Sequence, residues 1–115
     1  MDGCIFCKIV KKEIPAIVLY ENEKVMAFKD INPEAPAHIV IVPKKHVTGM
    51  KEIDESNISI ISDIHLAAIE IAKEQKIYDT GFRLINNCGE NAGQTIFHLH
   101  YHLLGGKNLG QRLLI

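Results

Sequence analysis

Three histidines stand at every second position near the C-terminal end of the chain, at His98, His100 and His102. In a β-strand, alternate side chains project from one face at a spacing of roughly 7 Å, so the three imidazoles would form a row on a rigid element. Imidazole titrates near neutral pH and can serve as a nucleophile, a proton donor or a hydrogen-bond donor to phosphate. The row predicts a reaction surface, with a surface metal strip or unrelated strand histidines as the alternatives.

A glycine-containing loop over residues 86–95 ends three residues before His98. Glycine has no Cβ, so Gly89 and Gly93 allow backbone N–H groups to approach an anion and point at it. Such loops are common and say little by themselves. Placed directly before a row of histidines, this loop predicts a cradle for phosphate oxygens.

Cys4 and Cys7 form a C-x-x-C pair with three interpretations. A thioredoxin-like redox pair needs a βαβ setting, which the sequence lacks. The pair could be two buried thiols, or half of a structural zinc site whose other two ligands would be histidines. The total of three cysteines is odd and no export signal is present, which argues against a disulfide framework.

The pattern of apolar and turn residues predicts an α+β fold with a largely antiparallel sheet. Five strands ordered as a meander are expected, together with one long helix and a short N-terminal helix. The strand 38–42 is apolar almost throughout, which is typical of a strand covered on both faces. The expected ranges are a helix over 4–12, strands over 17–20, 24–29, 38–42, 81–86 and 98–104, and a long helix from the capping residues 54–57 to about 78.

The long helix has two apolar flanks. One has the spacing of a core face, and the second adds more apolar surface than a helix packed on one sheet needs. The second flank could form a subunit interface or lie deeper in the same core. The first flank comprises Ile61, Ile64, Ala68 and Ile71, and the second comprises Ile58, Leu66 and Ile69.

Length and charge limit the class of protein. A chain of 115 residues is expected to form one domain, residues 1–115, with one core. Its 13 basic and 14 acidic residues leave no basic footprint, which argues against binding of polymeric DNA or RNA. No apolar stretch is long enough to cross a bilayer and no leader is recognisable, so we expect a cytoplasmic protein without a membrane partner.

The histidine row and its surrounding segments resemble the histidine triad (HIT) family of nucleotide hydrolases and transferases, in its Hint-like branch. The resemblance extends from Cys4 to Gly106 and includes the triad in the family's order of apolar and histidine positions. It implies a HIT-like fold for the single domain. The other matching segments are residues 5–6, 13–16, 28–33, 35–38, 43–46 and 93–95.

The resemblance implies a role for each of three histidines. His100 is the nucleophile that attacks the α-phosphate and carries a covalent nucleotidyl group, which water then hydrolyses. His38 helps to orient the nucleophile and relays protons, and His102 donates to the phosphate or the bridging atom. Taken alone, His38 also fits a satisfied polar residue at a strand start, and His102 fits a partly exposed strand histidine.

The resemblance also implies a nucleotide pocket. The loop contacts the phosphate or the leaving group, a carboxylate accepts both ribose hydroxyls, and apolar side chains enclose a purine. Each apolar residue alone also fits an ordinary core. The residues implied are Asn87, Gly93, Gln94 and Thr95 in the loop, Asp30 at the ribose, and Ile5, Phe6, Phe28 and Ile31 around the purine.

Three further implications concern metal, assembly and the C-terminal tail. HIT relatives that keep the cysteines place structural zinc at positions matching Cys4, Cys7, His46 and His98. Hint relatives are dimers, which favours a homodimer through the second helix flank. Thr95 stands where most Hint relatives have serine, and its methyl group would narrow the tolerance for bulky leaving groups. Residues 107–115 contain no tryptophan, unlike the aromatic tail of many Hint proteins.

The leading expectation is a hydrolase that cleaves purine nucleoside phosphoramidates or acyl-adenylates to a nucleoside monophosphate. One alternative is a dinucleoside polyphosphate hydrolase or a nucleotidyltransferase of the same superfamily. The other is a non-catalytic nucleotide-binding interaction module.

Overall fold

Five strands form one antiparallel sheet in the order β1-β2-β3-β5-β4 in the computed structural model, which describes residues 3–111 and 113. The predicted α+β class is confirmed. The strands are β1 (Val18–Glu21), β2 (Val25–Lys29), β3 (Ala37–Pro43), β4 (Phe82–Asn86) and β5 (Tyr101–Gly105), and the helices are α1 (Ile5–Val10), α2 (Ser59–Glu74) and the 3₁₀ turns η1 (Met50–Glu52) and η2 (Glu90–Ala92).

The predicted meander order is wrong at one position. After β3 the chain crosses the sheet through α2, and β4 forms the edge while β5 returns between β3 and β4. A crossover through a helix can pass over a strand position, which a tight hairpin cannot do. As a result β5 lies next to β3, and the histidines of both strands share one sheet face.

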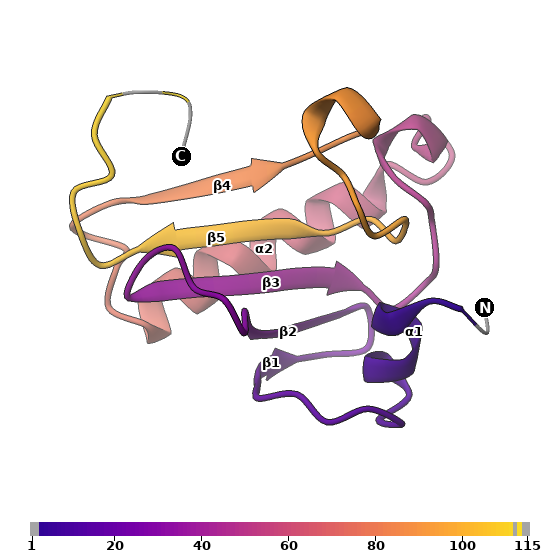
Figure 1. Ribbon diagram of the computed structural model, residues 1–115, viewed down its shortest axis with the longest axis horizontal. Helices are drawn as coiled ribbons and strands as arrows, with labels where there is room; N and C mark the ends of the chain where they lie inside the picture. Colours follow the sequence, from indigo (N-terminus) through magenta and orange to yellow (C-terminus); the bar gives the residue numbers. More distant parts are fainter. Residues whose placement is uncertain (1–2, 112, 114–115) are drawn as a thin grey trace.

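The two sheet faces carry separate apolar clusters. α2 covers one face, where Ile64 and Ile71 pack with Ile39 and Leu103 (Figure 1). The opposite face carries a smaller cluster of α1 and sheet residues that includes Phe6, Phe28 and Val40. Every residue from His38 to Pro43 of β3 is buried, which confirms the prediction of a strand covered on both sides.

The predicted end of the long helix at residue 78 is wrong, because α2 ends at Glu74. Lys76 takes the left-handed conformation with φ of 60°, and the Ile77 N–H donates to the Ala72 carbonyl at 2.9 Å. This is the hydrogen-bond pattern of a helix C-terminus that usually contains glycine. A lysine at that position gave no signal in the sequence.

The predicted capping residues 54–57 lie just before α2 but do not cap it. Ile58 occupies the N-cap position, and no side-chain hydrogen bond satisfies the first turn. Asn57 instead accepts from the Asp54 N–H at 2.7 Å, and Asp54 accepts from the Ser56 N–H at 2.8 Å. These bonds close turns within the connecting segment, a common alternative use of such side chains.

The last strand begins at Tyr101, so the prediction of a strand from residue 98 is wrong at its start. Leu99 donates its N–H to the Val47 carbonyl at 2.7 Å, outside the ladder between β3 and β5. Its side chain nevertheless lies in the α2-side core with Leu103, while the histidines lie on the other face. Among the residues that the structure describes, no helix has the length and apolarity needed to span a membrane.

Candidate active site and metal centre

Strand register brings His38 and His102 together. In the β3–β5 ladder, His38 pairs with Leu104 and Val40 pairs with His102, so the two histidines are diagonal neighbours on one face. Diagonal neighbours lie within reach of long or aromatic side chains. Their ring centroids are 5.1 Å apart, and His38 Nε2 lies 2.9 Å from His102 Nδ1.

A backbone contact fixes the tautomer of His100, that is, which ring nitrogen carries the hydrogen in the neutral ring. Its Nδ1 lies 2.8 Å from the carbonyl oxygen of His98, and a carbonyl can only accept, so Nδ1 carries the hydrogen. In the neutral ring, Nε2 is therefore the unprotonated nitrogen. The ring is 8% exposed and packs against the edge of Phe6, with centroids 5.1 Å apart. His100 thus has the lone pair that a nucleophile requires.

A second backbone contact fixes His38 in the opposite way. Its Nδ1 accepts the N–H of Glu34 at 3.0 Å, so the hydrogen of the neutral ring lies on Nε2. Nε2–H then donates to His102 Nδ1, which leaves the hydrogen of His102 on its own Nε2. The sequence gives no signal for Glu34, because its contribution is a main-chain N–H.

Asp30 completes an Asp–His cluster with His38 and His102. Its Oδ2 lies 3.4 Å from His38 Nε2 and 3.8 Å from His102 Nδ1. Burial, together with smaller effects of the nearby His100 and His38, lowers the pKa of His102 to about 4 against the opposing effect of Asp30. At neutral pH the ring of His102 in the free chain is uncharged, with Nε2–H as its available donor.

A Cys–His cluster forms on the same sheet face from residues far apart in the sequence. Its four donor atoms, from Cys4, Cys7, His46 and His98, lie within 4.8 Å of one another. His98 Nδ1 lies 3.3 Å from Cys4 Sγ and 3.1 Å from His46 Nδ1, and Cys7 Sγ lies 3.2 Å from His46 Nδ1. Tetrahedral zinc would separate such atoms by about 3.3 to 3.6 Å.

The chemistry of the donor atoms also fits a metal. His98 Nε2 lies 2.8 Å from the Pro43 carbonyl, so it carries the hydrogen, and Nδ1 faces the cysteines with its lone pair. Burial lowers the pKa of His98, which keeps the ring neutral as a ligand must be. Burial and the neighbouring Cys4 raise the pKa of Cys7, so metal binding would release a proton from this thiol.

Hydrogen bonding distinguishes the two clusters chemically. The Asp–His cluster also groups three possible metal donors. However, the His38 nitrogen that faces the cluster carries a hydrogen, because the other nitrogen accepts from Glu34. A metal there would have to break that backbone contact. The donor atoms of the Cys–His cluster therefore fit a metal better than those of the Asp–His cluster, whose groups are hydrogen-bonded to one another.

In the predicted phosphate loop, two side chains bind the loop itself. Gln94 is 7% exposed; its Oε1 accepts from the Gly89 N–H at 2.8 Å, and its Nε2 donates to the carbonyls of Thr48 and Ile96. Asn87 donates to the Ala92 carbonyl at 2.9 Å. Gly93 and Thr95 are exposed, and Gly93 has φ of 85°, which favours glycine. Gln94 therefore orders the loop in the free chain.

The structure groups only part of the predicted purine pocket. Phe6 and Phe28 pack at 5.6 Å between centroids within the smaller cluster. Ile31 is 92% exposed and Ile5 is 44% exposed, so neither encloses a purine in the free chain. Ile5 instead lines a groove of about 640 Å³ beside the Cys–His cluster, together with His46, Thr48, Thr95, Ile96 and Phe97.

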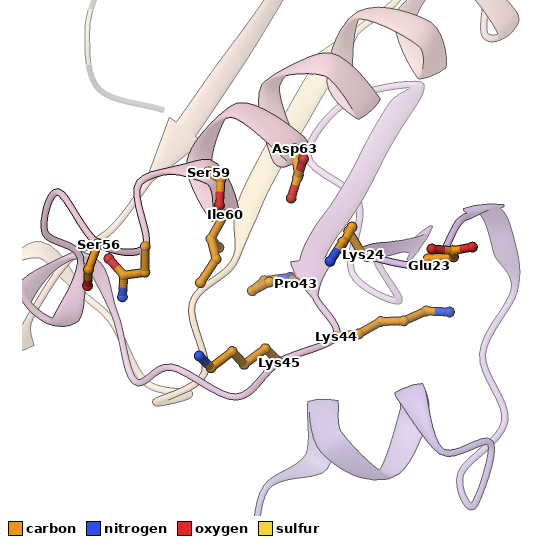
Figure 2. Close-up of a pocket in the computed structure, with 10 residues that line it drawn as sticks. Glu23, Lys24, Pro43, Lys44, Lys45, Ser56, Ser59, Ile60 and Asp63 are labelled. Carbon is orange, nitrogen blue, oxygen red and sulfur yellow. The ribbon is translucent and has the colours of Figure 1, made fainter.

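A separate cavity of about 350 Å³ lies where the β1–β2 turn and the end of β3 meet the start of α2 (Figure 2). Lys44 and Lys45 point in opposite directions there, and Lys44 forms an ion pair with Glu21 at 2.7 Å. The cavity shares no residue with the predicted site. Its lining includes Pro43, whose carbonyl accepts from His98.

Comparison with known sequences supports the geometry. A family model described as "Scavenger mRNA decapping enzyme C-term binding" matches residues 3–113. The "14 kDa zinc-binding protein" of Zea mays is 46% identical over 107 residues, covering 91% of this chain and 83% of that protein. The "Purine nucleoside phosphoramidase" of Escherichia coli K12 is 38% identical over 112 residues, covering 97% and 94%.

Solved structures agree with these matches. A HIT family hydrolase from Clostridium thermocellum superposes with a TM-score of 0.97 at 54% identity, covering 99% of each chain. A histidine triad protein from Clostridium difficile superposes with a TM-score of 0.93 at 51% identity, covering 97% of this chain and 96% of that chain.

Proposed function

The chain belongs to the histidine triad family, and from this premise we propose that it hydrolyses purine nucleoside phosphoramidates or acyl-adenylates to a nucleoside monophosphate. The observation that carries the proposal is the hydrogen bond from His100 Nδ1–H to the His98 carbonyl. In the neutral ring it leaves the lone pair of Nε2 available to attack phosphorus.

In the first step His100 Nε2 attacks the α-phosphorus, and the bond from phosphorus to the leaving nitrogen or acyl oxygen breaks. The nucleotidyl group is then bonded to Nε2, and the imidazolium that forms keeps its Nδ1–H on the His98 carbonyl. Splitting the displacement in two lets an imidazole replace water in the harder step.

His102 supplies the proton for the leaving group. The phosphate of a bound substrate is an anion, and an opposite charge nearby favours the imidazolium form. His102 then donates from Nε2. Because its Nδ1 now carries a hydrogen, the 2.9 Å contact with His38 Nε2–H gives way, and Nδ1–H turns to Asp30 Oδ2, which lies 3.8 Å away in the free chain. In the second step water loses a proton to His102 and attacks phosphorus, which releases the monophosphate and restores neutral His100.

The nucleoside is proposed to bind across α1 and the start of the 30–36 loop. Asp30 Oδ1 accepts the Asn32 N–H at 2.8 Å, which fixes the carboxylate where ribose hydroxyls could donate to it. Phe6 and Phe28 offer ring edges to the base. Ile5 and Ile31 would have to close over the purine on binding, and Asn87, Gly93 and Thr95 would contact the phosphate or leaving group.

The Cys–His cluster is proposed to hold one zinc ion. Zinc there would supply a structural cross-link between α1, the segment after β3 and the triad, with no open coordination position for chemistry. His98 is then a structural residue, and the catalytic histidines are His38, His100 and His102.

A homodimer is proposed through the second flank of α2. Ile58, Leu66 and Ile69 are all exposed in the single chain, where their apolar area remains in water. Light scattering should give twice the chain mass, and a charged substitution such as Leu66→Glu should give the single-chain mass.

The activity can be tested with adenosine 5′-phosphoramidate. The wild-type chain should produce AMP, and His100→Ala should lower turnover by about 10⁴-fold or more while AMP affinity stays within a few fold. His65→Ala is the matched control, because His65 lies on α2 and outside both clusters. Normal turnover by His100→Ala would disprove the assigned nucleophile, and faster cleavage of a dinucleoside polyphosphate would favour that alternative class.

A further inference from the structure

Of three contacts that hold the ring of His100, one is with His102 at 5.3 Å between centroids, and the other two come from residues of the Cys–His cluster or from between them. The first is the 2.8 Å hydrogen bond to the carbonyl of His98, whose own side chain supplies a cluster donor. The second is the 5.1 Å edge contact with Phe6, which lies between Cys4 and Cys7 in the sequence. On these two sides, the position of the His100 ring therefore depends on the residues of the Cys–His cluster.

We propose that the Cys–His cluster, when it holds its metal, positions the nucleophile, through the His98 carbonyl on one side and through α1 and Phe6 on the other. The inference rests on the zinc site proposed above and extends it from general stability to orientation of the reacting ring. Cys4, Cys7 and His98 are positioning residues in this account, because they act on substrate only through His100.

The smaller apolar cluster packs against Phe6, while α1 itself supplies little stability. The helix has six residues, which is too short for stability without tertiary contacts. Cys4 caps it by accepting the Cys7 N–H at 3.3 Å, and Cys4 and Cys7 lie on the same side of the helix. Two metal bonds at these positions would fix α1 against His98 and His46, and Phe6 with it.

The direction of the His98 carbonyl depends on how the side chain of His98 is held. Its ring is completely buried, its Nε2–H is bound to Pro43 at 2.8 Å, and its Nδ1 faces Cys4, Cys7 and His46. With both ring nitrogens fixed, the residue has little freedom to rotate, so its carbonyl keeps its direction toward His100. If the ring of His98 loosens, that carbonyl can turn away, and the hydrogen of His100 can then occupy either nitrogen.

Loss of the His98 contact should affect the chemical step and not nucleotide binding. Only the tautomer with a hydrogen on Nδ1 has a free Nε2, so loss of the His98 contact removes reactive molecules without removing the nucleotide pocket. A group that acts only in the transition state affects kcat more than KM. Loss of the metal is therefore expected to lower kcat and to leave KM nearly unchanged.

The test compares Cys4→Ser/Cys7→Ser with Cys88→Ser, a matched control outside the cluster. Zinc content is measured by native mass spectrometry, the hydrogen position on His100 by ¹⁵N NMR, and kcat and KM with adenosine phosphoramidate. The double variant should lack zinc, show a mixture of His100 tautomers, and lose about 10- to 100-fold in kcat with KM within a few fold. Cys88→Ser should match the wild type in zinc content and in the hydrogen position on His100.

A zinc-free double variant with wild-type kcat and an unchanged His100 spectrum would overturn the proposal. If the double variant does not fold, His46→Ala decides, because it removes a donor from the segment that carries neither α1 nor the triad; zinc loss with an unchanged spectrum and kcat would again overturn it. Failure of the wild type to cleave any phosphoramidate would contradict the proposed function alone, because the NMR comparison does not depend on substrate.

Discussion

The Cys–His cluster and the Asp–His cluster lie on the same sheet face and use the same side chain for different purposes. In the first, a backbone carbonyl accepts from His98 Nε2 and leaves Nδ1 free for a metal. In the second, a backbone N–H donates to His38 Nδ1 and leaves a hydrogen on Nε2. The comparison teaches that the nearest main-chain group determines which ring nitrogen keeps its lone pair, and therefore which of the two proposed roles, metal ligand or proton carrier, each imidazole suits.

The largest effect that can separate the clusters is on turnover. His102→Ala removes the proposed proton donor and should lower kcat by about 10² to 10⁴-fold, with zinc content unchanged. His46→Ala should do the reverse, with loss of zinc and a smaller fall in kcat. Steady-state kinetics and native mass spectrometry check both, and the distinction fails if His102→Ala loses zinc or keeps its kcat.

The next effect is on stability. Native mass spectrometry should find one zinc per chain, and Cys4→Ser should lose it. Zinc at a free concentration a thousand times its dissociation constant stabilises the folded chain by about 4 kcal/mol. The melting temperature of Cys4→Ser should therefore be lower than that of the wild type by about 10 °C or more. Calorimetry of the wild type, Cys4→Ser and Cys88→Ser provides the check. A metal-free chain with an unchanged melting temperature would show that the cluster is a group of ordinary thiols and imidazoles.

A smaller effect on stability, caused by protonation and not by metal binding, is expected from the Asp–His cluster. The pKa of His102 falls to about 4 in the folded chain, against about 6.5 when unfolded, so between these values the unfolded state binds more protons. The contribution of His102 to the free energy of unfolding is fully present above pH 6.5. It falls by about 3 kcal/mol as the pH is lowered toward 4. Urea unfolding at pH 7 and 4.5 should show a smaller loss in His102→Asn than in the wild type. Equal losses would contradict the shifted pKa.

The smallest expected effect concerns the leaving group. Thr95→Ser removes one methyl group from the exposed end of the loop and should raise kcat/KM for bulky leaving groups by a few fold to tenfold, with little change for unsubstituted phosphoramidate. A series of amine leaving groups of increasing size provides the measurement. If the ratio of kcat/KM for small amines to that for large amines is the same in both proteins, Thr95 does not contact the leaving group.

The sequence predicted the elements whose signal is local. The continuous apolar run of β3 and the alternation around His102 identified strands, and the C-x-x-C pair identified half of the Cys–His cluster. The row of histidines was correctly assigned to one face, although hydrogen bonding of Leu99 to Val47 delays the start of β5. The end of α2 was missed because Lys76, and no glycine, adopts the left-handed conformation.

The features that determine chemistry were not available from the sequence. The contacts that fix the tautomers are main-chain groups of Glu34, Pro43 and His98, which any residue type could provide. Likewise, Gln94 was predicted to contact phosphate, while its amide binds three backbone groups in the free chain. Most of these contacts join residues at most five positions apart, and they depend on the local backbone conformation, which the residue types do not specify.

The most direct test of the account is to locate the covalent nucleotidyl group during turnover. The wild-type chain is mixed with excess adenosine phosphoramidate, quenched into alkali after a few milliseconds to seconds, and mapped by peptide mass spectrometry. The account predicts an adenylyl group on His100. An adenylyl group on another residue, or none on His100 at any quench time during active turnover, would contradict it.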